Sequence, residues 1–128
     1  CYEIIFPNLI SLQERPNVII NITNDAWFGR TLGPYQHLSQ ARLRAIEEGL
    51  PLVRVANTGI SAAFNYKGIL LGKINLLEKG ILDIPVSLKQ EKTIYSKFRW
   101  KITILITLTL TLFSVFLDVS FSSRQKMK

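Results

Sequence analysis

The side chains best suited to chemistry lie in two places, at Cys1 and in the run from Asn21 to Gly29. Cys1 is the single cysteine, so the sequence offers no internal disulfide and does not indicate a redox compartment. An N-terminal cysteine can act as a nucleophile with its own α-amine as the base, as in N-terminal nucleophile hydrolases, although no other part of this chain supports that chemistry. It can also carry the lipid of a mature lipoprotein, but such proteins usually continue with a small polar tether, unlike Tyr2-Glu3-Ile4-Ile5-Phe6.

The second place is a loop that follows a predicted strand. Val18-Ile19-Ile20 is a β-branched apolar run, too short for a helix and typical of a buried strand. Open α/β sheets bind their ligands in the loops after their strands, and this loop combines Asn24 and Asp25 with the large aromatic residues Trp27 and Phe28. A turn closed by a hydrophobic plug explains the same residues equally well, because Asn-Asp is ordinary turn chemistry.

The segments around this loop predict a small α/β domain. A helix is indicated from about Tyr35 to Gly49, because apolar residues recur at helical spacing after Gly33-Pro34. Short apolar runs predict the other strands, at residues 1–6 (leading into a helix that ends before Pro16), 52–56, 60–64, 69–72 and 81–86. A tight turn is expected at residues 65–68. With one helix for about five strands, one sheet face would stay bare unless another segment or chain covers it.

Positive charge is concentrated at the C-terminal end of the chain. Of the net charge of +7, residues 1–88 contribute +1 and residues 89–128 contribute +6. The basic residues flank an apolar run instead of alternating with aromatic residues, so a nucleic-acid partner is not expected and we interpret them as membrane anchors. The 48% hydrophobic content of the 128 residues excludes a disordered chain.

The apolar run is Ile102 to Phe121, which contains one charged residue, Asp118. A helix of this length spans about 30 Å, the thickness of a hydrocarbon core, so the sequence predicts a transmembrane helix. Alternation over residues 107–113 favours a strand locally, but a lone strand of this length would leave its backbone groups unpaired. Trp100 and Tyr95 are typical of the membrane interface, whereas equal basic counts on the two sides leave the orientation undetermined.

Small hydroxyl residues recur along one face of that predicted helix, at Thr103, Thr107, Thr111 and Ser114. This spacing is typical of a helix-packing surface, with chance scatter as the alternative. The predicted organisation is a partial domain over residues 1–88, a basic juxtamembrane linker over 89–101, the transmembrane helix over 102–121 and a basic tail over 122–128.

His37 is the single histidine, without a surrounding cluster of metal-ligating residues. We therefore interpret it as a structural hydrogen-bonding residue, and expect neither a metal nor a cofactor.

Several motifs, taken in order, resemble one family. Cys1-Tyr2-Glu3 precedes an apolar run, and the motifs that follow are N-D-A-W-F-G at 24–29, G-P-Y-Q-H at 33–37, A-R-L-R-A at 41–45 and A-N-T-G-I-S-A at 56–62. This series, over residues 1–72, resembles the apolipoprotein N-acyltransferases, the membrane-bound branch of the nitrilase, or carbon–nitrogen hydrolase, superfamily. The hydrophobic run near the C-terminus, which soluble nitrilases lack, favours that branch.

The resemblance implies the C-terminal part of a nitrilase-like α-β-β-α sandwich in a bacterial inner membrane, with the soluble part in the periplasm. It implies that Cys1 is the nucleophile, which takes an acyl chain from a phospholipid as a thioester and passes it to the N-terminal amine of a diacylglyceryl-modified lipoprotein. Glu3 matches a glutamate that supports this site. The residues expected to line or shape the substrate pocket are Tyr2, Asn24, Asp25 and Trp27.

The sequence also departs from the family pattern. The superfamily uses a Glu as general base and a Lys to stabilise the oxyanion, both upstream of the nucleophile, and Glu3 is not that base. We therefore interpret the chain as a C-terminal fragment and expect it to be inactive without the N-terminal half of the enzyme. The segment Q-E-K-T-I-Y-S-K-F at 90–98 resembles the approach to the family's last helix, but Ile94 stands where a Pro is usual. The alternative is a non-catalytic, membrane-anchored remnant or interaction module.

Overall fold

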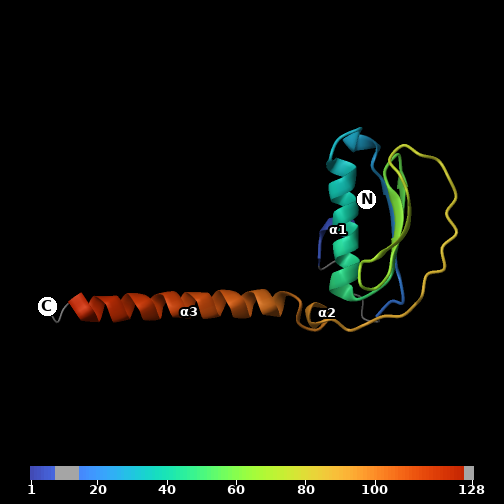
Figure 1. Ribbon diagram of the computed structural model, residues 1–128. Coiled ribbons are helices and arrows are strands. Elements are labelled where there is room, and N and C mark those ends of the chain that lie inside the picture. Colours follow the sequence, from blue (N-terminus) through green and yellow to red (C-terminus); the bar gives the residue numbers. More distant parts are fainter. Residues whose placement is uncertain (8–14, 126–128) are drawn as a thin grey trace. The chain divides into compact units, whose positions relative to one another are not determined.

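The computed structural model describes residues 1–7 and 15–125 and divides into two units, Cys1–Ser96 and Lys97–Lys128 (Figure 1). The first unit holds a four-stranded sheet with helix α1 (Gly33–Glu48) on one face. Two short 3-10 turns, η1 (Glu3–Ile5) and η2 (Ala26–Phe28), lie before α1 in the sequence. The second unit holds helix α3 (Trp100–Gln125), and α2 (Ile94–Phe98) lies at the division between the units.

The sheet is ordered β1-β2-β3-β4, and its strands are β1 (Ile19–Asn24), β2 (Leu52–Asn57), β3 (Ser61–Phe64) and β4 (Leu70–Ile74). β1 and β2 run parallel, with Ile19 opposite Leu52 and Asn24 opposite Asn57, and α1 supplies the crossover that parallel neighbours require. The pairs β2–β3 and β3–β4 are antiparallel. The predictions of four strands, and of a turn at residues 65–68 where the Gly68 N–H donates to the Asn65 carbonyl, are confirmed.

Helix α1 begins and ends where its local sequence indicates. Pro34 lies in its first turn, where the missing N–H costs no hydrogen bond. Gly49 follows its last residue with φ of +62°, and the Gly49 N–H donates to the carbonyls of Ala45 and Ile46. The predicted helix is thus confirmed, with a start two residues earlier than expected.

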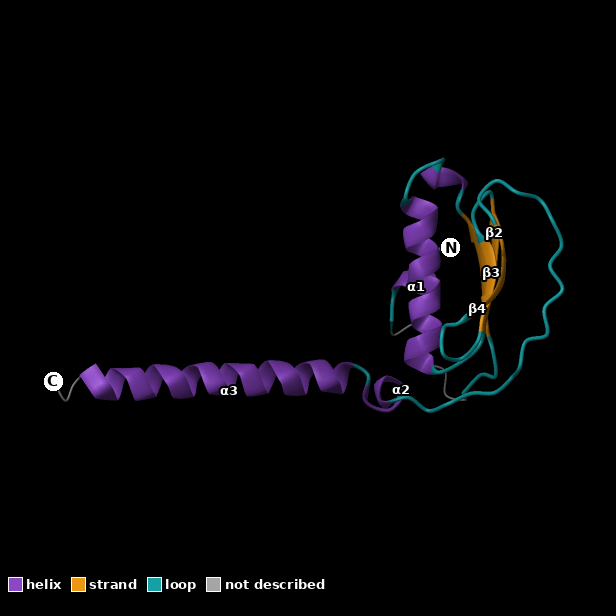
Figure 2. Ribbon diagram, in the orientation of Figure 1, coloured by secondary structure: helices purple, strands orange, loops and turns teal. Residues whose placement is uncertain are grey.

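The core lies on the inner face of the sheet, which we define as the face covered by α1 (Figure 2). Alternation along the strands sends the side chains of Ile19, Leu52, Ala62 and Phe64 to this face, where they pack with Ala41 and Ala45 of α1 and with Ile4 and Leu50. Ala41 and Ala45 are fully buried, because small side chains let the helix backbone approach the sheet closely.

The outer face of the sheet, which carries Ile20, Ile22, Val53, Val55 and Ala63, is covered differently. The segment after β4, residues 75–93, forms no strand and passes along this face (Figure 1). A cavity of about 390 Å³ lies between the face and residues 80–86. The predicted strand at 81–86 is therefore wrong, because Pro85 lacks an N–H for a sheet ladder and the segment stacks over the sheet instead of joining its edge.

The N-terminal prediction is also corrected. Residues 1–6 do not end a strand: they contain the short turn η1 (Glu3–Ile5), and the Ile5 and Phe6 N–H groups donate to the carbonyls of Tyr2 and Glu3. The tight turn is what lets Ile4 reach the core. The helix expected before Pro16 falls largely on residues 8–14, outside the described residues.

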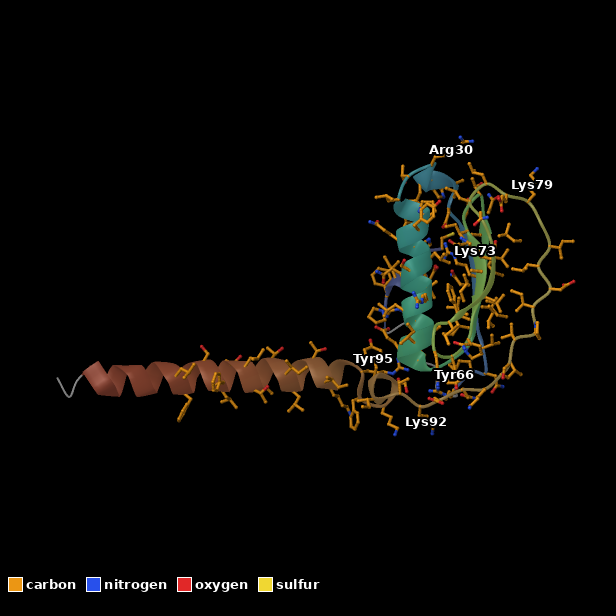
Figure 3. The ribbon with its side chains drawn as sticks, in the orientation of Figure 1. Arg30, Tyr66, Lys73, Lys79, Lys92 and Tyr95 are labelled. Atoms are coloured by element: carbon orange, nitrogen blue, oxygen red, sulfur yellow. The ribbon has the colours of Figure 1, made fainter. Side chains whose placement is uncertain are left out.

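The basic side chains of the first unit are mostly exposed, and two of them lie near Tyr66. Tyr66, labelled in Figure 3, has the ammonium groups of Lys67 and Lys89 each 5.5 Å from its ring centroid. Lys73, Lys79 and Arg30, labelled in the same view, are exposed, as is most of the charge on this unit.

In the second unit, residues 102–121 lie within the single helix α3, so the helix is confirmed over the competing strand. The threonines bond within the helix, with the hydroxyls of Thr107 and Thr111 donating to the carbonyls of Thr103 and Thr107 at 2.9 and 2.8 Å. The membrane span is not confirmed, since no helix among residues 1–7 and 15–125 combines the length and apolar character needed to cross a bilayer.

Candidate functional site

The thiol of Cys1 lies against the end of strand β1. Its Sγ accepts a hydrogen bond from the backbone N–H of Asn24 at 3.4 Å. The Thr23 hydroxyl donates to the Cys1 carbonyl at 3.5 Å. The structure therefore brings together the two chemistry-bearing segments that the sequence analysis singled out. A donor on sulfur favours the thiolate, which is the reactive form of cysteine.

The Glu3 side chain lies at the N-terminal amine of Cys1. Its carboxylate Oε2 pairs with the N-terminal ammonium of Cys1, and this hydrogen bond lowers the pKa of Glu3. Both groups are exposed to solvent. Glu3 thus lies beside Cys1, and its role in supporting the site stays a prediction.

Asn24 joins the ends of the two parallel strands. Its side-chain oxygen accepts hydrogen bonds from the Ala26 N–H and from the side-chain amide of Asn57, both at 3.1 Å. The Asp25 N–H then donates to the Asn57 carbonyl at 3.0 Å. These bonds fix the backbone at the point where the Asn24 N–H faces the sulfur.

Asp25 is buried below that loop, at 1% exposure, in a polar network on the inner face of the sheet. Its Oδ2 accepts a hydrogen bond from Arg54 Nη2 at 2.6 Å, and its Oδ1 lies 2.8 Å from His37 Nδ1. Arg54 also donates through Nη1 to the side-chain oxygen of Asn21 at 2.6 Å and through Nε to the Ile60 carbonyl at 3.3 Å. The hydrogen bond confirms the interpretation of His37 as a structural hydrogen-bonding residue.

The electrostatics of the network balance burial against pairing. Burial lowers the pKa of Arg54, and the charge of Asp25 opposes that shift. Because an unpaired charge in this position would be strongly unfavourable, each of the two groups requires the other. Gly59 leaves the room for Asp25, since a Cβ at position 59 would lie 2.4 Å from its Oδ2.

An aromatic cluster connects the network to Cys1. The Tyr2 ring stacks on His37 with centroids 5.8 Å apart and planes at 26°, and Phe28 meets both rings edge-on. The three rings line a cavity of about 300 Å³ together with Ile5, Gly33, Gln36 and Gln40. Tyr2 is thus placed at a cavity wall next to Cys1.

Trp27 lies in η2 with 82% of its surface exposed. It follows Asp25 in the loop, but its indole points to solvent and not into the buried network. The four residues expected in a substrate pocket therefore occupy different environments: Tyr2 and Trp27 are exposed, Asn24 caps the loop and Asp25 is buried behind it.

Sequence reasoning missed Arg54, Asn21 and Thr23 as parts of the site. The signal that was present is a charge within the apolar strand run Leu52–Ala56. Strand alternation places Arg54 on the same face as the buried Leu52, and a cation on a core face requires a buried acceptor. Asp25 is the acidic partner that the parallel pairing of β1 and β2 brings within reach.

A match to a known family defines the class of protein to which this chain belongs. Residues 1–94 match the carbon–nitrogen hydrolase family, and the chain belongs to this family. The relatives that it resembles are named apolipoprotein N-acyltransferase: the protein of Rhodopseudomonas palustris is 50% identical over 98 residues, and that of Rickettsia bellii 48% identical over 120 residues. These matches cover 76% and 91% of this chain.

The matches cover much less of the relatives. The aligned part is 18% of the Rhodopseudomonas palustris protein and 23% of the Rickettsia bellii protein, so the chain spans about a fifth of their length. The protein of Brucella suis, 44% identical over 116 residues, gives the same proportion, 22%.

Proposed function

We propose that this chain supplies the nucleophilic cysteine of an apolipoprotein N-acyltransferase. Support comes from its similarity to relatives of that name and from the contact between Cys1 and the loop after β1. The contact between the Asn24 N–H and Sγ is the single observation that carries the proposal, because it gives an exposed thiol a fixed position and a donor that favours the thiolate.

The proposed reaction has two steps. The Cys1 thiolate attacks an ester carbonyl of a phospholipid, which forms a thioester and releases the lysophospholipid alcohol after it takes up a proton. The α-amine of a diacylglyceryl-modified lipoprotein then attacks the thioester and forms an amide, and the proton that the amine loses goes to the leaving sulfur, which regenerates the Cys1 thiol. Glu3 supports the nucleophile in this scheme, and Tyr2, Asn24, Asp25 and Trp27 form or brace the substrate pocket.

We infer that the general base and the oxyanion-stabilising lysine of the superfamily lie on a segment other than residues 1–128. In an α-β-β-α sandwich, that segment would also cover the outer face of the sheet, where Ile20 and Ile22 are exposed. We therefore propose that the chain alone is inactive, and that the assembled enzyme works on the periplasmic side of a bacterial inner membrane, where its phospholipid donor lies.

The test is to label membranes with a phospholipid that carries a clickable acyl chain. The 128-residue chain is compared alone and co-expressed with the upstream segment of its gene, and Cys1→Ser is the control in both samples. We expect a hydroxylamine-sensitive label only in the co-expressed wild-type sample, because Cys1 is the only thiol in the chain. No label in either sample, with the chain folded, would overturn the proposal in favour of a non-catalytic remnant or interaction module.

A further inference from the structure

We propose that His37 is a positioning residue for the Cys1 nucleophile, acting through the flat face of its ring. The inference rests on the proposed function, in which Cys1 is the reactive group. His37 is 4% exposed and lies 36 residues from Cys1 in the sequence, and the Tyr2 ring stacks on it. Nothing in the sequence motif around Cys1 indicates this contact.

The His37 ring has a fixed orientation. Its Nδ1 lies 2.8 Å from Asp25 Oδ1 and 3.1 Å from Arg54 Nη2, and Asp25 and Arg54 are each 1% exposed. A ring held at one nitrogen by a buried ion pair cannot turn without breaking that contact, which is unfavourable in the interior.

The His37 ring in turn fixes the backbone next to the nucleophile. Tyr2 stacks on His37, and Phe28 closes the cluster edge-on. Ile4, two residues further on, is buried in the core. The backbone from Cys1 to Ile4 is thus held at Tyr2 and at Ile4, which leaves little freedom for the thiol.

Both partners of the sulfur contact are attached to one network. Cys1 is held through Tyr2 and His37, while Asn24, which donates to Sγ, precedes the buried Asp25. Thr23 strengthens this link, with its hydroxyl 3.5 Å from both the Cys1 carbonyl and Asp25 Oδ1. The position of the sulfur relative to its donor is therefore set by the stack of Tyr2 on His37 on one side and by the loop at Asp25 on the other.

The remaining edge of His37 supports a role in stacking. Within residues 1–7 and 15–125, His37 Nε2 is buried and has no hydrogen-bond partner. The ring therefore contributes one polar contact, through Nδ1, and otherwise a flat surface. A phenyl ring in its place would keep the surface and lose the polar contact, whereas asparagine would keep a donor near Asp25 and lose the surface.

The test measures the rate at which iodoacetamide alkylates Cys1 in the full 128-residue chain at neutral pH, with urea denaturation recorded on the same variants. Because Cys1 is the single cysteine, alkylation reports on it alone. We expect His37→Asn to slow alkylation several-fold, since the thiol loses its fixed position beside the Asn24 N–H, a hydrogen-bond donor that favours the reactive thiolate. His37→Phe should restore the rate to within about twofold of wild type, even though it removes the hydrogen bond to Asp25.

Two further variants keep the test decisive. Tyr2→Ala removes the stack from the exposed side, without altering the buried network, and should slow alkylation as much as His37→Asn. Glu47→Gln, which breaks the 2.7 Å ion pair with Arg44 on the same helix, is the matched control and should leave the rate unchanged. A role in stability alone would make the rates follow the denaturation midpoints instead of following the presence of a ring at position 37.

The proposal is overturned if His37→Phe is as slow as His37→Asn, or if Tyr2→Ala reacts like wild type. Its failure is distinct from failure of the proposed function. An acyl label that forms on wild type and survives equally in His37→Asn rejects positioning alone. The expected alkylation pattern without any acyl label on the co-expressed chain rejects the acyltransferase alone.

Discussion

The two faces of the sheet differ although the same strands build both. On the inner face, Leu52 is fully buried and Arg54 is enclosed with its acidic partner, whereas on the outer face Ile20 and Ile22 are 67% and 74% exposed. Alternation distributes the side chains, but α1 closes one face while a strandless segment and a cavity of about 390 Å³ lie at the other. Side-chain type therefore does not decide burial here, since a cation is buried and two isoleucines are not. The layer that covers each face decides it.

The largest expected effect tests the buried ion pair on the inner face. Arg54→Met leaves Asp25 buried without its cation, so we expect the free energy of unfolding to fall by about 3–5 kcal/mol in urea denaturation followed by circular dichroism. Adding Asp25→Asn removes the uncompensated charge and should recover part of that loss. A double variant as unstable as Arg54→Met would show that the two charges do not stabilise each other.

The second test compares the two faces at adjacent positions. Ile19→Ala, on the inner face, should lower the free energy of unfolding by about 2–4 kcal/mol, because it leaves a cavity in the core. Ile20→Ala, on the outer face, should change it by less than about 1 kcal/mol, because the side chain is already exposed. Equal losses in denaturation experiments would contradict the difference between the faces.

The third test concerns the room left for Asp25. Gly59→Ala places a Cβ 2.4 Å from the Asp25 carboxylate, and the resulting shift should lower the free energy of unfolding by about 1–3 kcal/mol. Gly80→Ala is the control, because its Cβ would meet only Ile74 Cδ1 at an ordinary 3.7 Å. Identical denaturation midpoints for the two variants would mean that the network tolerates displacement of Asp25.

The smallest effect on stability is expected on the outer face. Ile22→Lys should change the free energy of unfolding by less than about 0.5 kcal/mol, because the position is open to solvent. It should nevertheless reduce self-association, measured by sedimentation velocity, because it interrupts an exposed apolar patch. Ile22→Val, which keeps the patch apolar, is the control, and equal sedimentation of the two variants would argue against association through this face.

Much of the fold was predictable because it depends on local signals. Helix α1 follows from apolar spacing bounded by Pro34 and Gly49, and the β3–β4 hairpin follows from the turn ending at Gly68, whose φ is +72°. The errors lie where local pattern was ambiguous. Residues 81–86 were expected to form a strand but contain Pro85. Residues 1–6 were expected to end a strand but contain the turn η1, in which Ile4 is buried.

The candidate site was predictable only in part. Cys1 and the loop at Asn24 could be singled out by residue type, and the family motifs gave their expected roles. Arg54 could not be assigned without a partner, because a charge inside a strand run has several possible acceptors. Its pairing with Asp25 depends on the register of β1 against β2, in which Asn24 lies opposite Asn57.

The sequence by itself determined helix α1, the turn at residues 65–68 and the single thiol, because these depend on side-chain size, backbone freedom and composition over a few neighbouring residues. Only the tertiary structure decided which distant groups meet: the Asn24 N–H with the sulfur of Cys1, and Asp25 with both His37 and Arg54. Such contacts form when strand pairing and the packing of α1 bring separate segments together. Their geometry is therefore a property of the packed layers and not of any one segment.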